Sequence, residues 1–300
     1  MKTYLDCLPC FLNQALRAGR IATNDETKIK ELLDEVGAMI KEIPMENTPP
    51  ETGAIIYRKI SEITGNNDPY KAIKEKNIAH ALQLYPELKK IVKRSDDRLL
   101  TAIRLAVAGN VIDLGVNREF DLVEEIEKIL HQEFAVLDYE YFKQELYKAK
   151  EILYIGDNAG EAVFDKILIE ELGKPVTFVV REIPIINDIT IKEARRIGID
   201  KVATIISSGT TAPGTILELC NQEFIQKFND ADLIISKGQG NYEGLSGVER
   251  SVFFLLKAKC PVIARNIGVR ENDIVLKGRN VSSPSVPDGN TREDSCTTEL

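Results

Sequence analysis

The sequence has no tryptophan and only two histidines, His80 and His131, among its 300 residues. Both histidines fall on predicted helices of the first half, so we do not expect general acid–base catalysis by histidine. The Gly-x-x-x-x-Gly-Lys-Ser/Thr motif is also missing, which excludes a P-loop NTPase, and no Gly-x-Gly-x-x-Gly follows the first predicted strand of the second half. The Asp-x-Asp motif of aspartate-nucleophile phosphatases is absent too, because Asp157 is followed by Asn158 and Ala159.

Basic residues are in the minority, with 39 Lys and Arg against 47 Asp and Glu. This balance argues against a nucleic-acid partner, since phosphate backbones are bound mainly through Lys and Arg. The sequence has no apolar run of about 18 residues and no basic-then-apolar amino terminus. We therefore expect no membrane span and no signal peptide, and a cytoplasmic protein.

The five cysteines are an odd number, which fits a reduced compartment better than a disulfide framework. Cys7 and Cys10 form a lone Cys-x-x-Cys, which supplies only half of a tetrahedral zinc site. Cys260, just before Pro261, could join them in space as a second metal or redox site. The sequence leaves this open.

The first half, residues 1–149, has the pattern of an all-α domain. One helix face carries an apolar set at helical spacing, with Thr23 and Asn24 as capping candidates. A second helix follows Pro49-Pro50 and ends at Gly65, and a third begins near Pro69, with Pro86 expected to end or kink it. Further helices are predicted around residues 96–113, 120–131 and 139–148. The apolar set is Ile29, Leu32, Leu33, Val36, Ile40 and Ile43.

After residue 149 short apolar runs alternate with helical segments, which is typical of βαβ units and a mainly parallel sheet. The runs cover residues 152–155, 176–180, 202–206, 233–235 and 252–256, with a shorter one at 262–263. We predict a three-layer αβα Rossmann-like domain over residues 150–277, packed on the helical domain. The polar segment 278–300 is predicted to be a flexible tail.

Polar loops follow four of these strands, and in a parallel sheet they face one crevice. Asp157 and Asn158 follow the first strand, and Asp188 follows the second. Once Asn158 turns its carbonyl inward, the three side chains offer only oxygen ligands, which suits Mg²⁺ or Mn²⁺. An Asp-Asn pair at a strand end is also a common helix cap or Asx turn.

The other two loops have the character of an anion cradle. Ser208, Gly209 and Thr210 offer hydroxyl and backbone N–H groups before a probable helix. Lys237 adds a positive charge, and the glycines at 238 and 240 allow the backbone to wrap a phosphate closely. A solvated loop and a tight turn are the plainer alternatives. The full set of predicted substrate-binding residues comprises Glu161, Ser208, Gly209, Thr210, Lys237, Gly238, Gln239, Gly240, Asn241, Asn110 and Asp113.

Asn110 and Asp113 belong to the stretch Gly-Asn-Val-Ile-Asp at residues 109–113, in the helical half. They are three residues apart and share a helix face, while Gly109 allows close approach of another backbone. The alternative is a solvated helix end with a packing glycine. If they reach the crevice, they would help to close it over a substrate.

Four stretches together resemble the damage-control phosphatase family, long known as domain of unknown function 89. They lie at residues 109–113, 156–161, 187–190 and 237–243, and the resemblance extends to about Lys277. The early Cys7-x-x-Cys10 resembles the prokaryotic subfamily that carries this pair. Some members have been named as protein-carboxyl methyltransferases.

The resemblance implies an α-helical domain packed on an α/β domain, and hydrolysis of small phosphate monoesters such as sugar phosphates. It implies a divalent metal (Mn²⁺, Co²⁺, Ni²⁺ or Mg²⁺) at Asp157, Asn158 and Asp188, with Lys237 on the substrate phosphate. We expect a metal-activated water as nucleophile, with direct attack by Asp157 as the competing version. The alternatives are a methyltransferase using S-adenosylmethionine and a non-catalytic metal or redox module built on Cys7 and Cys10.

Overall fold

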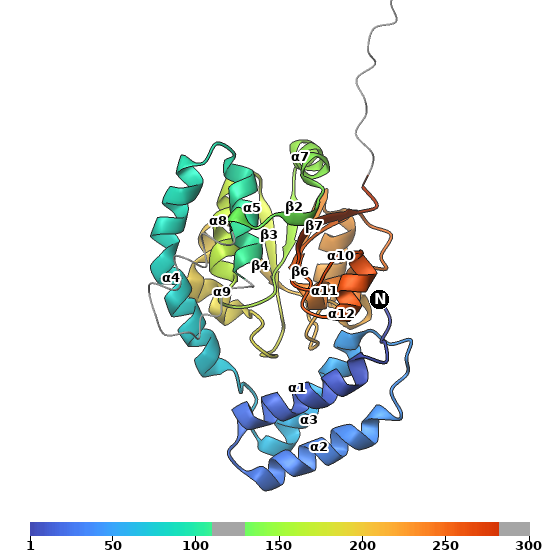
Figure 1. The fold of residues 1–300 in the computed structure, drawn as a ribbon. Helices are drawn as coiled ribbons and strands as arrows, with labels where there is room; N and C mark the ends of the chain where they lie inside the picture. The colour runs from blue at the N-terminus through green and yellow to red at the C-terminus, as the bar shows by residue number, and fades with distance from the viewer. Residues whose placement is uncertain (110–129, 282–300) are drawn as a thin grey trace, which may run out of the picture.

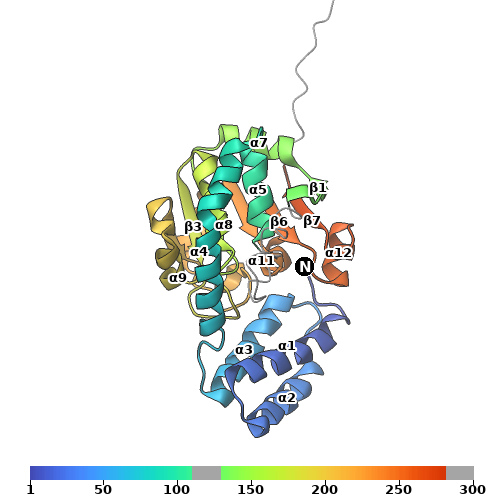
Figure 2. The ribbon, with the colours of Figure 1, turned by 60° about the vertical axis from the view of Figure 1, so that its left-hand side comes forward.

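The computed structural model describes residues 1–109 and 130–281. Helices α1 (Cys7–Ala22), α2 (Glu26–Ile40) and α3 (Pro49–Thr64) form a small bundle below the rest of the molecule in Figures 1 and 2. Its core contains Phe11, Leu32 and Ile56. Ile29, Leu32 and Val36 of α2 are buried, as the apolar spacing of the sequence predicted.

The ends of these helices show what the local sequence fixes. Thr48 and Glu51 form a capping box at the start of α3, and Gly65 ends the helix in the left-handed conformation, as expected. The cap of α2 is Asp25, which accepts hydrogen bonds from the next turn, and not the predicted Thr23 or Asn24. Pro86 lies inside α4 (Lys71–Arg94) and does not end it, since the helix continues for two more turns along the sheet domain.

The described residues contain a seven-stranded sheet in the order β1-β7-β6-β5-β2-β3-β4. Strands β2 (Ile152–Ile155), β3 (Val176–Val180), β4 (Thr204–Ser207), β5 (Leu233–Lys237) and β6 (Val252–Lys257) are mutually parallel. Strand β7 (Ile274–Arg279) runs antiparallel to β6, and β1 (Phe134–Leu137) pairs with β7. A mainly parallel sheet is confirmed.

Helices cover both faces of this sheet (Figure 1). On one face α4, α5 (Arg98–Ala108) and α8 (Ala162–Leu172) share a core that includes Phe164 and Phe178. On the other face α10 (Gln222–Asp230), α11 (Gln239–Leu245) and α12 (Pro261–Ile267) bury Phe224, Phe254 and Ile263. Helices α7 (Tyr139–Lys148) and α9 (Ile191–Ile197) and the 3₁₀ turns Ile199–Lys201 and Leu217–Leu219 complete the connections.

Three sequence expectations need correction. The segment before residue 149 is not all helical, because β1 joins the edge of the sheet; its apolar run of four residues is short and lies between two predicted helices. Strand β7 was not predicted. Val262 and Ile263 belong to α12, where Pro261 occupies the first turn, and not to a strand.

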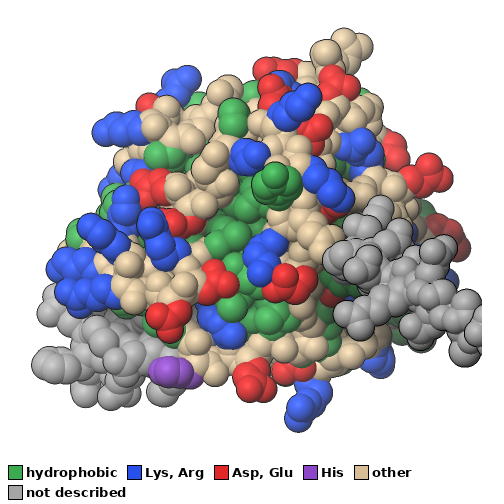
Figure 3. All heavy atoms as spheres, turned by 90° about the horizontal axis from the view of Figure 1, so that it is seen from above, with side chains coloured by type: hydrophobic (Ala, Val, Ile, Leu, Met, Phe, Trp, Pro, Cys, Tyr) green, Lys and Arg blue, Asp and Glu red, His purple; other side chains and the backbone are tan. Residues whose placement is uncertain are grey.

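The division at residue 149 stays a prediction, although one strand of the sheet precedes it. Strand β7 reaches Arg279, two residues into the segment expected to be a tail, and residues 282–300 lie outside the described part of the chain. In the described ranges, no helix is long and apolar enough to cross a membrane. The face in Figure 3 shows acidic and basic side chains interspersed around hydrophobic ones.

The bundle lies against the edge where β2, β3, β4 and β5 end (Figure 1). A Cβ on Gly53 of α3 would come within 2.8 Å of the Pro213 ring, so the helix touches the loop after β4. Ile186, from the loop after β3, and Val262 of α12 both pack into the bundle core. The carboxyl ends of the parallel strands are therefore covered by the helical bundle, which creates a sheltered site.

Candidate active site

Asp157, Asn158 and Asp188 come together, as the parallel topology predicted. Asn158 and Asp188 form an isolated β-bridge between the loops after β2 and β3. The Ile189 N–H donates to the Asp157 carbonyl at 2.9 Å, and the Ala159 N–H donates to the Asn187 carbonyl at 2.9 Å. Backbone hydrogen bonds thus join the two loops and fix the spacing of the three side chains.

The orientation of Asn158 is set by two carboxylates. Its Nδ2 donates to Asp157 Oδ2 at 3.0 Å and to Glu161 Oε2 at 3.0 Å. Because these carboxyl oxygens accept the hydrogen bonds, the amide nitrogen and not the amide oxygen faces them. Asn158 can then present only Oδ1 to a cation, which is the ligand orientation that the sequence analysis required.

Asp188 is held by Arg181, a residue that the sequence analysis did not assign to the site. Arg181 Nε donates to Asp188 Oδ2 at 2.8 Å, and both side chains are buried. The same guanidinium donates to Thr215 Oγ1 at 3.2 Å and to Asn241 Oδ1 at 2.8 Å. An arginine directly after a predicted buried strand could have indicated this role, because a buried cation must have anionic or polar partners.

Lys237 is fully buried, and its ammonium contacts three acceptors. Nζ lies 2.8 Å from the Ala106 carbonyl and 2.5 Å from both Glu161 Oε1 and Asp165 Oδ1. Tyr154 also donates its hydroxyl to Asp165 Oδ1 at 2.7 Å. Lys237 therefore neutralises two buried carboxylates in the structure, and its contact with a substrate phosphate stays a prediction.

Burial and like charges perturb the titration of this cluster. Burial raises the pKa of Asp157 well above its ordinary value, and the carboxylates of Asp188 and Glu161 raise it further. Burial also raises the pKa of Asp188, although Arg181 opposes the change. Burial raises the pKa of Asp165 to about 7 against the effect of Lys237. Burial lowers the pKa of Lys237, but Asp165 and Glu161 outweigh it, so the net change is upward.

The polar groups of the loop at residues 208–210 form hydrogen bonds within the protein, unlike those of an open anion-binding loop. Ser208 and Thr210 are both fully buried. The Ser208 hydroxyl donates to the Val180 carbonyl at 3.1 Å, and the Gly209 N–H donates to Ser207 Oγ at 3.1 Å. The hydroxyl of Thr210 accepts from the Ala212 N–H at 3.3 Å. These donors already have partners within the protein, and a role in phosphate binding stays a prediction.

In the segment at residues 238–241, Gly238 lies beside Asp157 and Gln239 points away from that carboxylate toward Cys260. Gly238 has a φ of 77°, and a Cβ there would lie 1.9 Å from Asp157 Oδ2, so only glycine fits beside that carboxylate. A Cβ on Gly240 would lie 2.1 Å from the Pro213 carbonyl. The Asn241 amide is buried and donates to the Gly156 and Lys237 carbonyls at 3.0 and 2.8 Å. Gln239 instead contacts Glu243 and Cys260.

Gly109 gives close contact between the helical half and the site. A Cβ on it would lie 3.2 Å from Glu161 Cα and 2.9 Å from the Phe164 ring. The predicted close approach of another backbone is thus present. The predicted residues Asn110 and Asp113 lie outside the described part of the chain.

The cysteines differ in exposure: Cys7 is buried, Cys10 is exposed and Cys260 is intermediate. Burial raises the pKa of the Cys7 and Cys260 thiols, which opposes thiolate formation. Across residues 1–109 and 130–281, no group of three or more His, Cys, Asp or Glu side chains is arranged to hold a metal ion. The predicted site at Asp157, Asn158 and Asp188 has a different composition, with two carboxylates and one amide.

This architecture, a helical bundle over the carboxyl edge of a mainly parallel sheet, with buried carboxylates in the covered loops, defines a class of α/β proteins with a sheltered polar site. Residues 3–275 match the model of the damage-control phosphatase ARMT1-like domain. The chain belongs to the damage-control phosphatase family.

Several relatives match over nearly their whole length. The damage-control phosphatase PH1575 of Pyrococcus horikoshii is 38% identical over 282 residues, covering 92% of this chain and 97% of that protein. A damage-control phosphatase of Archaeoglobus fulgidus is 36% identical, covering 90% of this chain and 97% of its own. The crystal structure of the Pyrococcus protein, a DUF89 family member, superposes with a TM-score of 0.85 at 37% identity and covers 92% of this chain and 98% of that chain.

Proposed function

We propose that this protein is a metal-dependent phosphatase that hydrolyses small phosphate monoesters. One observation carries the proposal: Asp157 and Asp188 are buried together, the backbones of Asn158 and Asp188 are bridged, and the side-chain amide of Asn158 is oriented by Asp157. A bound cation would stabilise the ionised forms of two buried carboxyl groups whose pKa values are raised by burial. Family membership supports the phosphatase role.

The donor set fits a hard divalent cation. Asp157, Asn158 Oδ1 and Asp188 would hold Mg²⁺, Mn²⁺, Co²⁺ or Ni²⁺ through oxygen atoms. When bound, such a cation neutralises phosphoryl oxygens and makes a water more acidic.

The surrounding residues would orient this site. Arg181 fixes Asp188 through the 2.8 Å hydrogen bond, and Thr215 and Asn241 hold the guanidinium in turn. Lys237 forms an ion pair with one oxygen of Glu161, and the other oxygen of Glu161 accepts a hydrogen bond from the amide of Asn158. For Lys237 to contact a phosphate directly, its ammonium must give up one of its three present partners.

The nucleophile in this proposal is a water, with the Asp157 carboxylate as the competing one. Rapid acid quench of a single turnover distinguishes the two. Attack by Asp157 forms a covalent phospho-enzyme that the quench traps, and attack by water forms none. A phosphorylated peptide containing Asp157 would overturn the water version and leave the phosphatase intact.

The substrates proposed are small phosphorylated metabolites, with sugar phosphates the first class to test. A cytoplasmic location is proposed with them, supported by the free thiols of Cys7, Cys10, Cys220 and Cys260. The test is a panel of phosphate monoesters assayed with metal-loaded protein, alongside calorimetry with S-adenosylmethionine. Phosphate release without S-adenosylmethionine binding supports the phosphatase, whereas the converse supports the methyltransferase.

A further inference from the structure

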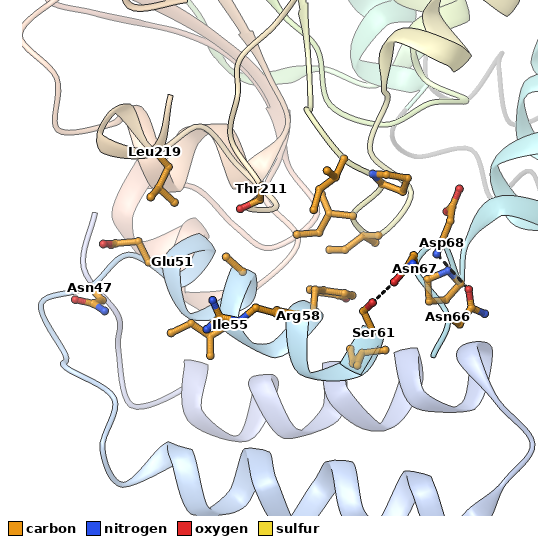
Figure 4. Close-up of a pocket in the computed structure, with 18 residues that line it drawn as sticks. Asn47, Glu51, Ile55, Arg58, Ser61, Asn66, Asn67, Asp68, Thr211 and Leu219 are labelled. Carbon is orange, nitrogen blue, oxygen red and sulfur yellow. Dashed lines mark hydrogen bonds between the residues drawn. The ribbon is translucent and has the colours of Figure 1, made fainter. Parts of the chain in front are cut away.

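A cavity of about 750 Å³ lies between α3 and the loops that follow β3 and β4. Figure 4 shows side chains reaching it from two sides: Ile55 and Arg58 come from α3, and Thr211 and Leu219 come from the sheet domain opposite. The cavity therefore sits at the junction of the bundle and the sheet domain. Asp157, Asn158 and Asp188 are not among its lining residues.

The wall of this cavity leads to the candidate metal site. Ile185 and Ile186 line it, and the Asp188 N–H donates to the Ile185 carbonyl at 3.0 Å. Tyr57 lines the cavity from the bundle. A group bound at Asp188 would thus have this cavity as its neighbour.

The wall is held in a strained shape. Ile186 has a φ of 46°, a left-handed conformation that a β-branched residue rarely adopts. Its side chain packs into the bundle core with Tyr57. Strain of this kind persists where the surrounding packing fixes it, and it is concentrated at ligand sites. The cavity is therefore built into the fold between the two parts of the chain.

The lining is mainly apolar, with polar side chains at both ends; in Figure 4 Asn47 and Glu51 lie at the end away from Asn67. Ala54, Ile55, Ile183 and Leu219 are among its apolar members, and Ile183 and Leu219 are 45% and 46% exposed. Large apolar side chains exposed around one concavity gain free energy when an apolar ligand covers them. Figure 4 places Ser61, Asn66, Asn67 and Asp68 together at one end, where Ser61 donates to Asn67 Oδ1.

We infer that this cavity binds the organic group of the phosphate monoester, and that it selects esters whose alcohol carries an apolar chain of several carbons. The inference rests on the proposed function, since the phosphate would be held beside Asp188. The apolar chain would lie between α3 and Ile183. A polar end group would reach Asn66, Asn67 or Asp68. The predicted preference, within the small phosphate monoesters proposed above, is therefore for esters with a longer apolar chain.

The test compares methyl, butyl and hexyl phosphate as substrates of the metal-loaded protein. We expect kcat/KM to rise about fourfold for each methylene that the cavity buries, by the transfer free energy of a CH₂ group. Ile183→Ser should reduce this chain-length dependence. Ile73→Ser is the matched control, because Ile73 is an isoleucine that is 38% exposed and lies outside the cavity lining. It should keep the dependence of the original protein.

Calorimetry with methylphosphonate and hexylphosphonate, which cannot be hydrolysed, measures the cavity independently of turnover. Tighter binding of hexylphosphonate, lost in Ile183→Ser and kept in Ile73→Ser, supports the inference. Equal affinities for the two phosphonates overturn it, even if every ester is hydrolysed. Absence of turnover for all esters, with tighter hexylphosphonate binding, would contradict the proposed function and leave the cavity assignment standing.

Discussion

Glu161 and Lys237 form a fully buried ion pair, with Nζ 2.5 Å from Oε1, and the second oxygen of Glu161 accepts a hydrogen bond from Asn158. Lys237 thus acts on the candidate metal ligands through Glu161. Glu161 is the N-cap residue of α8, and Gly109 at the end of α5 allows that helix to approach it closely. The orientation of Asn158 therefore depends on Glu161 at the start of α8 and on Lys237 at the end of β5.

Replacing Lys237 by Met should destabilise the fold. Glu161 and Asp165 would remain buried without their counter-charge, and breaking a buried pair by removing one partner costs about 3–5 kcal/mol. Urea unfolding monitored by circular dichroism measures the loss. Lys227→Met is the control, since Lys227 forms an exposed ion pair with Glu151, and such pairs contribute at most about 1 kcal/mol. Equal stability of the two variants would contradict the buried network.

Asp188→Asn should abolish metal-dependent phosphate release. The substitution keeps the shape of the side chain but removes a charged ligand, and we expect a loss beyond the 10–100-fold typical of residues that only support ligands. Asp188→Ala should lose activity too; both substitutions remove the anion beside Arg181, but alanine also removes the oxygen that accepts the Arg181 hydrogen bond. Steady-state kinetics at saturating metal provide the measurement. Full activity of Asp188→Asn under those conditions would remove Asp188 from the site.

Gly238→Ala should displace Asp157 and lose activity. Its Cβ would fall 1.9 Å from Asp157 Oδ2, in addition to the strain of a φ of 77°. Gly173→Ala separates these effects, because Gly173 has a φ of 63° and nothing within 4 Å of its Cβ position. The control should lose about 1–2 kcal/mol of stability from backbone strain alone and keep its turnover. Comparable activity of the two variants would mean that the contact with Asp157 is unimportant.

Stability of the metal-free protein should depend on the ionisation of Asp165, whose pKa burial raises to about 7. A carboxyl group with a folded-state pKa above its unfolded value of about 3.9 stabilises the fold below that value. This contribution is lost as the pH rises from about 3.9 to about 7. Relative to Asp165→Asn, the original protein should lose up to about 1.4 kcal/mol per pH unit in this window. Thermal melts from pH 4 to 8 in chelator measure the difference; parallel curves would rule out the raised pKa.

Much of the α/β architecture could be predicted because buried parallel strands are short apolar runs with clear ends. Strands β2 and β3 occupy the predicted residues, and the meeting of Asp157, Asn158 and Asp188 follows from parallel topology. Strand β1 was missed because its apolar run is only four residues long and lies between two predicted helices, and its pairing with β7 depends on residues distant in the sequence.

The supporting residues of the site were harder to predict because their roles depend on distant contacts. Asp165 lies on a helix among apolar neighbours, and only the structure shows that Lys237, 72 residues away, is its partner. Arg181 reaches Asn241 across 60 residues. In the sequence, Lys237 in a glycine-rich stretch has the character of an exposed phosphate ligand. Its full burial is a tertiary property.

The most direct test of the metal-dependent phosphatase is phosphate release from p-nitrophenyl phosphate by metal-stripped protein. Mg²⁺, Mn²⁺, Co²⁺ and Ni²⁺ are added back singly, with Asp188→Asn measured in parallel. We predict no release without metal, restoration by at least one of these cations, and little restoration in the variant. Full activity in the stripped protein, or no activity with any cation in protein shown to be folded, would contradict the account.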